Sequence, residues 1–161
     1  ATTSPLSAAN LQHLEDQVKD ITDATLTIGT WTPTLIGSST AGAQTYTIQV
    51  GTYTKIGKLV ICTCHVIISA KDVGIAGTAR IGSLPFAAHS LTNWFASVDI
   101  GFYQGITLDS GYSDFSGVIP SAGDYVILTE MGSGKSGAFL PVENVASATT
   151  INASFSYMAQ S

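Results

Sequence analysis

The spacing of apolar residues changes once along this chain, and that change limits the folds open to it. Up to residue 28 the large apolar residues recur every three or four positions, whereas after Gly29 they alternate with polar residues. The first spacing is that of an amphipathic α-helix and the second that of a half-buried β-strand. The sequence therefore predicts a helical segment over residues 1–28 and a single β-rich domain over residues 29–161.

The helix is expected to begin near Ala8. Ser7 stands just before a run of helix-forming residues, and its hydroxyl can accept a hydrogen bond from the first turn. The apolar residues of the helix follow the a and d spacing of a heptad repeat, continued more weakly by Thr25 and Ile28. The clear members of this stripe are Leu11, Leu14, Val18 and Ile21.

Something must cover this stripe, because a helix of about four turns is marginal in water by itself and burying each such side chain is worth roughly 1.5–3 kcal/mol. One possibility is that the helix lies on its own β domain. The other is a short parallel coiled coil with copies of the same chain, which the narrow stripe favours. The heptads leave the number of copies open, since Leu14 and Val18 favour dimers and Ile21 favours higher oligomers.

The clearest β pattern lies in residues 93–103. One face is expected to be apolar, and only Phe95 and Tyr103 interrupt the polar face. The expected apolar face comprises Trp94, Ala96, Val98, Ile100 and Phe102. Alternation over this length predicts a strand with one side on the core.

Residues 58–71 also alternate, but both faces are partly apolar. One face carries Val60, Cys62, Cys64, Val66 and Ile68. The other carries Leu59, Ile61, Thr63, His65, Ile67 and Ser69. Such a strand is expected to be covered on both sides, and in a sandwich domain a neighbouring subunit can supply the second cover.

Weaker alternation appears around residues 46–50, 126–128 and 151–157, and clusters of Gly, Ser and Asp separate these segments. Short strands divided by such turns are typical of antiparallel all-β domains. The predicted fold class is therefore mainly β: an antiparallel, jelly-roll-like β-sandwich that follows a short N-terminal coiled-coil helix.

Composition restricts the partners. The net charge is −5 and the six Lys and Arg residues are spread thinly, so no basic cluster is available for nucleic-acid phosphates. No segment approaches the roughly 20 apolar residues of a membrane helix. Cys62 and Cys64 stand two positions apart in a predicted strand, where they do not bridge easily, so free thiols and a reducing cytoplasm are expected. We expect neither nucleic-acid binding nor membrane insertion.

Five blocks of the sequence form a pattern that spans nearly the whole chain. They are PLSAANLQHLEDQV (5–18), GTWTPTL (29–35), TYTIQVGTYTKIGKLV (45–60), IGSLPF (81–86) and TINASFSYMA (150–159). This pattern resembles the C-terminal receptor-binding domains of bacteriophage tail fibres and tailspikes.

The resemblance implies a homotrimer in which a short coiled coil leads into a β-sandwich at the distal end of the fibre. It implies that the tip contacts lipopolysaccharide or capsule on the host, and that the rest of the fibre and the virion lie upstream. It also implies assembly in the cytoplasm of the host bacterium. The stripe of Leu11, Leu14, Val18 and Ile21 would then hold three helices together.

No arrangement of residues points to catalysis. The carboxylates of the β domain stand mostly beside Gly or Ser in predicted turns, where they commonly accept hydrogen bonds from the backbone. Cys62, Cys64 and His65 superficially resemble metal ligands, but alternation places His65 on the face opposite the cysteines. Residues 132–137 lack the context of a nucleophile elbow or a phosphate-binding loop. We expect no enzyme activity, no cofactor and no metal.

Sugar contacts are expected around residues 103–114, because aromatic rings pack on the C–H face of a pyranose and short carboxylates or amides bond its hydroxyl groups. The expected residues are Tyr103, Gln104, Asp109, Tyr112 and Asp114. Two alternatives remain for this segment. The tyrosines could simply be half-buried residues at strand ends, and residues 109–114 could offer oxygen ligands to calcium, although an ordinary polar loop is preferred.

The function predicted from these features is that of a non-enzymatic tail-fibre tip that binds a glycan on the bacterial surface. One alternative is a C-terminal trimerisation or folding cap that binds no receptor. Another is an esterase or depolymerase that acts on host polysaccharide.

Overall fold

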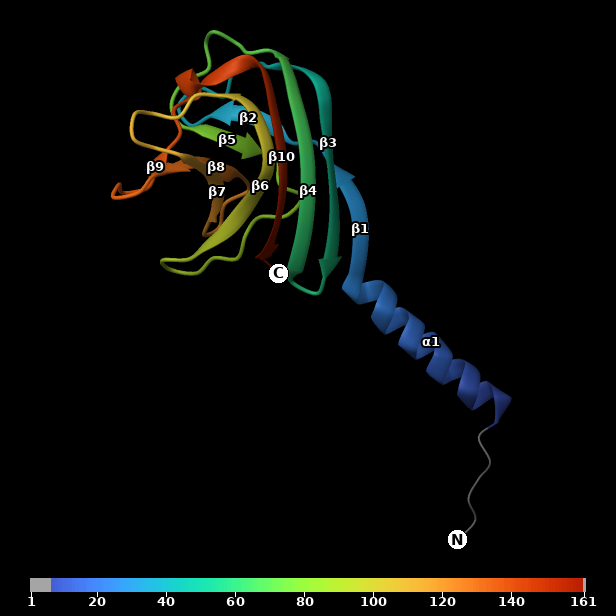
Figure 1. Ribbon diagram of the computed structural model, residues 1–161. Helices are drawn as coiled ribbons and strands as arrows, with labels where there is room; N and C mark the ends of the chain where they lie inside the picture. The colour runs from blue at the N-terminus through green and yellow to red at the C-terminus, as the bar shows by residue number, and fades with distance from the viewer. Residues whose placement is uncertain (1–6, 161) are drawn as a thin grey trace.

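The computed structural model of the protein describes residues 7–160, apart from the side chains of residues 20 and 22–25. One helix, α1 (Ala8–Thr25), extends away from a β-rich head (Figure 1). The strands of the head are β1 (Leu26–Trp31), β2 (Thr34–Gly37), β3 (Thr45–Ile56), β4 (Leu59–Ala70), β5 (Ala79–Gly82), β6 (Phe95–Ile106), β7 (Asp114–Pro120), β8 (Val126–Met131), β9 (Ala138–Phe139) and β10 (Val145–Met158). A short 3-10 helix, η1 (Val142–Asn144), precedes β10.

Helix α1 begins where the sequence predicts. The Ser7 hydroxyl accepts a hydrogen bond from the Asn10 N–H at 3.2 Å and so caps the first turn. The helix ends at Thr25 and β1 follows directly at Leu26, so Ile28 belongs to a strand and does not extend the heptad stripe. The helix therefore ends before the predicted boundary at residue 28, and the division into two domains stays a prediction.

All the strand pairs are antiparallel, and the sheet curls on itself. The strand order is β1-β3-β4-β10-β6-β7-β8-β5-β2, with β9 paired to β8. Strands β1 and β2 lie at opposite ends of this order, yet only residues 32–33 separate them in sequence. The Leu35 N–H of β2 also donates a hydrogen bond to the Tyr46 hydroxyl of β3 at 2.9 Å. The two ends of the sheet must therefore approach each other.

The curl divides the sheet into two facing halves. We call β1, β3, β4, β10 and β6 the first layer, and β7, β8, β5 and β2 the second layer (Figure 1). The prediction of a mainly β, antiparallel fold with one helix is confirmed, and the two facing halves agree with a sandwich-like arrangement. The finer jelly-roll class stays a prediction.

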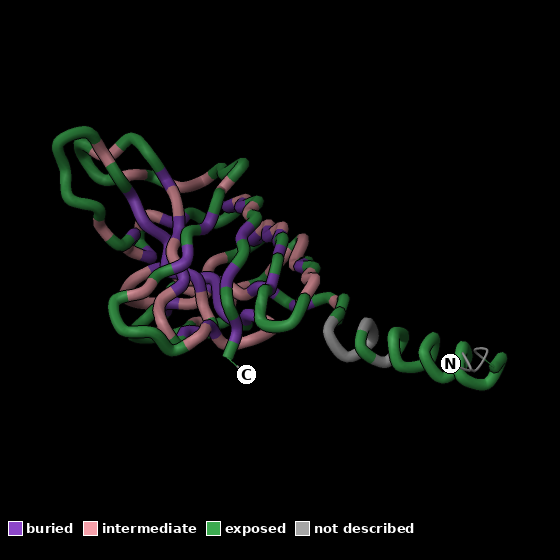
Figure 2. The backbone as a smooth tube through the Cα atoms, turned by 90° about the horizontal axis from the view of Figure 1, so that it is seen from below, coloured by how far each residue is buried: buried purple, intermediate pink, exposed green. Residues whose placement is uncertain are grey.

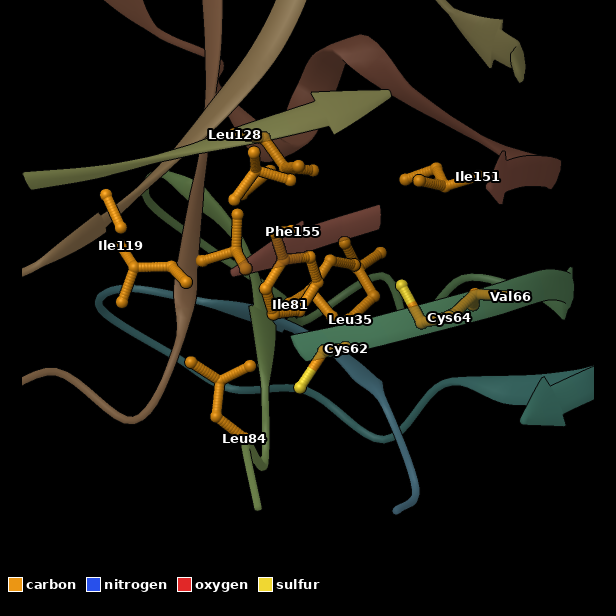
Figure 3. Close-up of a cluster of buried hydrophobic side chains, with 14 of the residues drawn as sticks. Leu35, Cys62, Cys64, Val66, Ile81, Leu84, Ile119, Leu128, Ile151 and Phe155 are labelled. Atoms are coloured by element: carbon orange, nitrogen blue, oxygen red, sulfur yellow. The ribbon is translucent and has the colours of Figure 1, made fainter. Parts of the chain in front are cut away.

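The hydrophobic core fills the space inside the curl. Figure 3 shows side chains from both halves converging there, and Figure 2 shows burial concentrated in the head while α1 is exposed. Aromatic rings contribute, since Trp31 contacts Phe155 edge to face with 6.2 Å between ring centroids. The largest fully buried apolar side chains are Leu35, Ile68, Ile119, Leu128, Leu140 and Ile151.

Strand β4 follows the alternation predicted for residues 58–71. Its inner face carries Val60, Cys62, Cys64, Val66 and Ile68, all of them buried. The two cysteines are free thiols. Burial raises the pKa of Cys62 to about 12 and that of Cys64 to about 11. Both thiols therefore stay protonated and unreactive near neutral pH.

Strand β6 corrects one sequence prediction. Ile100 pairs with Ala153, whereas Phe102 pairs with Asn152, the residue directly before Ala153 in β10. Gly101 therefore has no partner of its own and is an extra residue in β6. This bulge reverses the alternation. Phe102, expected to face the core, points outward and is 52% exposed. Tyr103, expected on the polar side, pairs with buried Ile151 on the inner face.

Candidate functional site

The outer face of the first layer, which points away from the core, is apolar at the end nearest α1. Strand register aligns two rows of side chains there, across β1, β3, β4 and β10. The first row is Leu26, Ile56, Leu59 and Met158, and the second is Ile28, Thr54, Ile61 and Ser156. We call the six apolar members, Leu26, Ile28, Ile56, Leu59, Ile61 and Met158, the apolar base.

The apolar base is open to solvent in the single chain. The exposed fractions of its side chains run from 38% at Leu59 to 72% at Ile28. A contiguous exposed apolar patch is uncommon on a soluble monomer and commonly marks an interaction surface. The apolar base therefore contributes little to the core of the head.

The heptad stripe of α1 is also exposed. Its four residues, Leu11, Leu14, Val18 and Ile21, have exposed fractions between 47% and 66%. Helix α1 points away from the head in both views (Figures 1 and 2). The possibility that this stripe packs on the β domain of its own chain is therefore not realised, whereas the coiled coil stays a prediction.

Beyond the apolar base, the same outer face also carries polar side chains. The third row across the strands is Thr30, Thr52, Thr63, Ser154 and Asp99, and the fourth is Val50, His65, Asn152 and Phe102. The hydroxyl groups of Thr52 and Thr63 are hydrogen-bonded to each other at 2.8 Å. The third row is thus polar throughout, whereas the fourth row mixes the exposed apolar residues Val50 and Phe102 with His65 and Asn152.

The third and fourth rows surround a shallow hollow of about 340 Å³, whose lining surface is mostly apolar and includes Val50. Its polar lining comes from Thr52, Thr63, His65, Asn152 and Ser154. Gly101, the bulge residue of β6, also lines the hollow, and a Cβ at that position would meet no atom within 4 Å. The hollow offers hydroxyl, amide and imidazole groups to a polar ligand. The sequence did not predict this hollow, although it placed Thr63 and His65 together on one face of residues 58–71.

Among the predicted sugar-binding residues, Tyr112 lies in a loop that packs against residues 132–137. Its hydroxyl donates a hydrogen bond to the Ser136 carbonyl at 3.1 Å. The Lys135 ammonium lies 5.3 Å from the Tyr112 ring centroid and donates a hydrogen bond to the Ser110 carbonyl. These contacts fix the ring in place, and Lys135 covers part of the surface that a sugar would use.

Asp109 is held from both its backbone and its side chain. Its N–H donates a hydrogen bond to the Glu130 carboxylate at 2.9 Å, and its own carboxylate accepts one from the Asn144 amide at 2.9 Å. Glu130 is completely buried, and its Oε1 has no hydrogen-bond partner among the described residues. Sequence reasoning placed most carboxylates in turns. The alternation from Val126 through Leu128 could have placed Glu130 on the inner face.

The remaining predicted residues do not share one surface with Tyr112. Tyr103 lies on the inner face, with its ring centroid 4.8 Å from that of Phe115. Gln104 pairs with Thr150 on the outer face of the first layer. Asp114 is exposed at the start of β7, where it pairs with Met131. The structure thus brings Asp109 and Tyr112 into one loop and separates Tyr103 from Gln104. Whether any of the five residues binds sugar stays a prediction.

Metal-binding groups and membrane-spanning helices are both absent from the described residues. Between residues 7 and 160, no three or more His, Cys, Asp or Glu side chains are grouped so that they could hold a metal ion. Among the described residues, no helix is both long enough and apolar enough to cross a membrane. His65 lies on the outer face and both cysteines on the inner face, which confirms the predicted separation of these side chains.

Comparison with known proteins finds a similarity of fold alone. No protein-family model and no curated protein matches the sequence. The fold is similar to the crystal structure of the Dettilon tailspike protein, with a TM-score of 0.64 and 18% sequence identity. The similarity covers 84% of this chain and 24% of the tailspike chain, so this chain spans about a quarter of that protein's length. Most of this chain therefore shares its fold with part of a phage tailspike protein.

Proposed function

We propose that the protein is the attachment tip of a phage tail fibre or tailspike, and that it binds a glycan on the bacterial surface without cleaving it. The observation that carries this proposal is the similarity of 84% of the chain to part of a tailspike protein. The sequence blocks that resemble tail-fibre tips support it independently. The proposed location is the distal end of the fibre on the virion, after assembly in the host cytoplasm.

The proposed tip is a homotrimer. The four stripe residues of α1 are each about half or more exposed and repeat at heptad spacing. A parallel coiled coil would bury them, and the resemblance to phage tips favours three strands over two. Buried, protonated Cys62 and Cys64 suit folding in a reducing compartment.

Three carboxylates of the head are engaged in its structure, which supports binding over cleavage at those positions. Asp72 accepts hydrogen bonds from the N–H groups of Gly74 and Ala43, at 2.9 and 2.8 Å, and these lower its pKa. A carboxylate held ionised is a poor general acid. Glu130 is buried in the core, and Asp109 is engaged with Asn144. These three carboxylates therefore serve structure in the single chain.

Two surfaces can receive the glycan: the loop of Asp109 and Tyr112, and the hollow on the outer face. Each offers only shallow contacts, so a single site is expected to be weak. Three copies on one tip, and several tips on a virion, can raise avidity by roughly 10² to 10⁴ without new contacts.

A binding assay with purified bacterial lipopolysaccharides and capsular polysaccharides tests this proposal. The whole chain should bind at least one of them in a saturable way, and no sugar or acyl group should be released. No binding to a panel that includes the natural host would overturn the adhesin proposal, and released fragments would show an enzyme.

Paired variants locate the site. Tyr112→Ala removes the ring, whereas Tyr112→Phe keeps the ring and loses only the hydroxyl bond to Ser136. If the ring stacks on sugar, binding falls with Tyr112→Ala and persists with Tyr112→Phe. Asp114→Ala tests the exposed carboxylate. Loss of binding with Asn152→Ala alone would place the site in the hollow.

The second candidate is a trimerisation or folding cap without receptor binding. The apolar base and the α1 stripe favour it, because both concentrate exposed apolar surface at one end of the head. Such a cap would form trimers but bind no glycan in the same assay.

A further inference from the structure

We infer that the apolar base is a contact surface between copies of this chain, so that the heads, as well as the helices, hold the oligomer together. This inference rests on the trimer of the proposed function and names its second interface. The occupant of the apolar base is thus the outer face of a neighbouring copy.

The first argument is the connection between α1 and β1. Helix α1 ends at Thr25 and β1 begins at Leu26, with no linker between them. Helices packed side by side have axes about 8–10 Å apart. Copies joined through α1 must therefore start their β1 strands close together. Leu26 and Ile28 lie in that first stretch of β1 and point outward from the sheet.

The second argument is the length of the helix. Helix α1 has 18 residues, which is about two and a half heptads, whereas a heptad pattern indicates a stable coiled coil when it is sustained for at least about three to four. Short helices are also marginal by themselves. The stripe alone therefore offers little apolar area for a stable oligomer, and the six side chains of the apolar base extend it directly.

The third argument is the pattern of polarity. The first two rows contain no charged residue, and Thr54 and Ser156 are their only polar members. Every member of the third row is polar, and Asp99 supplies the first charge there, whereas the fourth row mixes Val50 and Phe102 with His65 and Asn152. Protein interfaces combine an apolar centre with a polar rim. The contact is therefore expected to end at Thr52 and Thr63, which places the hollow of the outer face at its rim.

The test is sedimentation velocity over a range of protein concentrations, with Ile61→Glu and Ile28→Glu in the full chain. A charge buried without a partner weakens association strongly, so both variants should raise the dissociation midpoint by roughly 10²-fold or more. The control is Val73→Glu. Val73 is fully exposed in the loop after β4, and its substitution should leave the midpoint unchanged.

Three outcomes are distinct. If the wild type is a monomer at every concentration, the trimer of the proposed function fails together with this inference. If the wild type is a trimer and both glutamate variants keep its midpoint, this inference fails and the coiled coil alone holds the trimer. If the glutamate variants dissociate and Val73→Glu does not, the inference holds.

Cross-linking gives an answer even if a glutamate variant misfolds. Ile28→Cys would place a new accessible thiol in the apolar base, since Cys62 and Cys64 are buried. A short bis-maleimide should link Ile28→Cys chains into oligomers far more efficiently than Val73→Cys chains at equal concentration. Equal yields from the two variants would overturn the proposed contact.

Discussion

The two faces of β4 resemble each other in sequence but differ in the structure. On the inner face, Val60, Cys62 and Ile68 are completely buried. On the outer face, Leu59 and Ile61 remain about two-fifths exposed, although they are as apolar as their neighbours. Burial in the core of the single chain explains why the inner face is apolar. It does not explain why the outer face is apolar. The difference separates the residues that fold the head from those that we propose assemble it.

Of the substitutions that test this difference between the faces, Ile68→Ala should lower the free energy of unfolding the most. Ile68 is fully buried, and truncating such a side chain typically costs about 2–5 kcal/mol, from lost burial and the cavity left behind. Urea unfolding of the full chain should show this loss at every protein concentration. Its control on the same strand is Ile61→Ala, whose effect should appear mainly as a change in how stability depends on concentration. Equal, concentration-independent losses would remove the distinction between the faces.

The second largest effect is expected from high pH, which should destabilise the folded head through the two thiols of the inner face. Burial raises the pKa of Cys64 from 9.0 to about 11 and that of Cys62 to about 12, with the neighbouring Cys64 adding to the shift of Cys62. Above pH 9 the unfolded chain loses these protons while the folded chain keeps them. Stability is therefore fully present below pH 9 and falls as the pH rises toward 11, by at most about 1.4 kcal/mol per pH unit for each thiol.

Equilibrium unfolding at pH 8, 9, 10 and 11 measures this slope. The control is the double variant Cys62→Ala, Cys64→Ala, which separates the thiols from every other effect of high pH on the chain. The double variant should show a shallower decline than the wild type. If the two slopes are the same, the thiols do not titrate as the burial of this face requires.

Two glycines, one beside the core and one on the outer face, differ in the space around them. A Cβ on Gly51 would overlap the Trp31 indole on the inner face, whereas a Cβ on Gly101 would meet nothing within 4 Å. Gly51→Ala should therefore destabilise the head by roughly 1–3 kcal/mol through overpacking. Gly101→Ala should leave stability nearly unchanged. Thermal unfolding of both variants checks this, and a similar loss in each would mean that the outer position is more crowded than the structure shows.

The sequence was informative where a local pattern decides the structure. Alternation in residues 58–71 identified both faces of β4, and Ser7 identified the start of α1. Such signals depend on neighbours in the chain. The second cover expected for the partly apolar outer face of β4 stays a prediction, because Leu59 and Ile61 are exposed in the single chain.

The sequence failed where distant segments decide the structure. The bulge at Gly101 arises from pairing with β10, about fifty residues later in the chain, and it moved Phe102 outward and Tyr103 inward. The contacts of Tyr112 with Lys135 and Ser136 likewise join separate loops. The candidate sugar-binding residues were therefore predicted as one cluster, but the structure divides them among different faces.

Ser7→Ala should have the smallest effect, and it tests the helix end of the comparison. It removes the acceptor of the Asn10 N–H, and losing an N-cap typically costs about 1 kcal/mol. Because α1 is exposed in the single chain, this loss should lower helicity and oligomer stability while the head unfolds at the same temperature. Circular dichroism and sedimentation measure the two effects, and Ser7→Thr should preserve both. An equal loss of head stability would show that α1 supports the fold of its own chain.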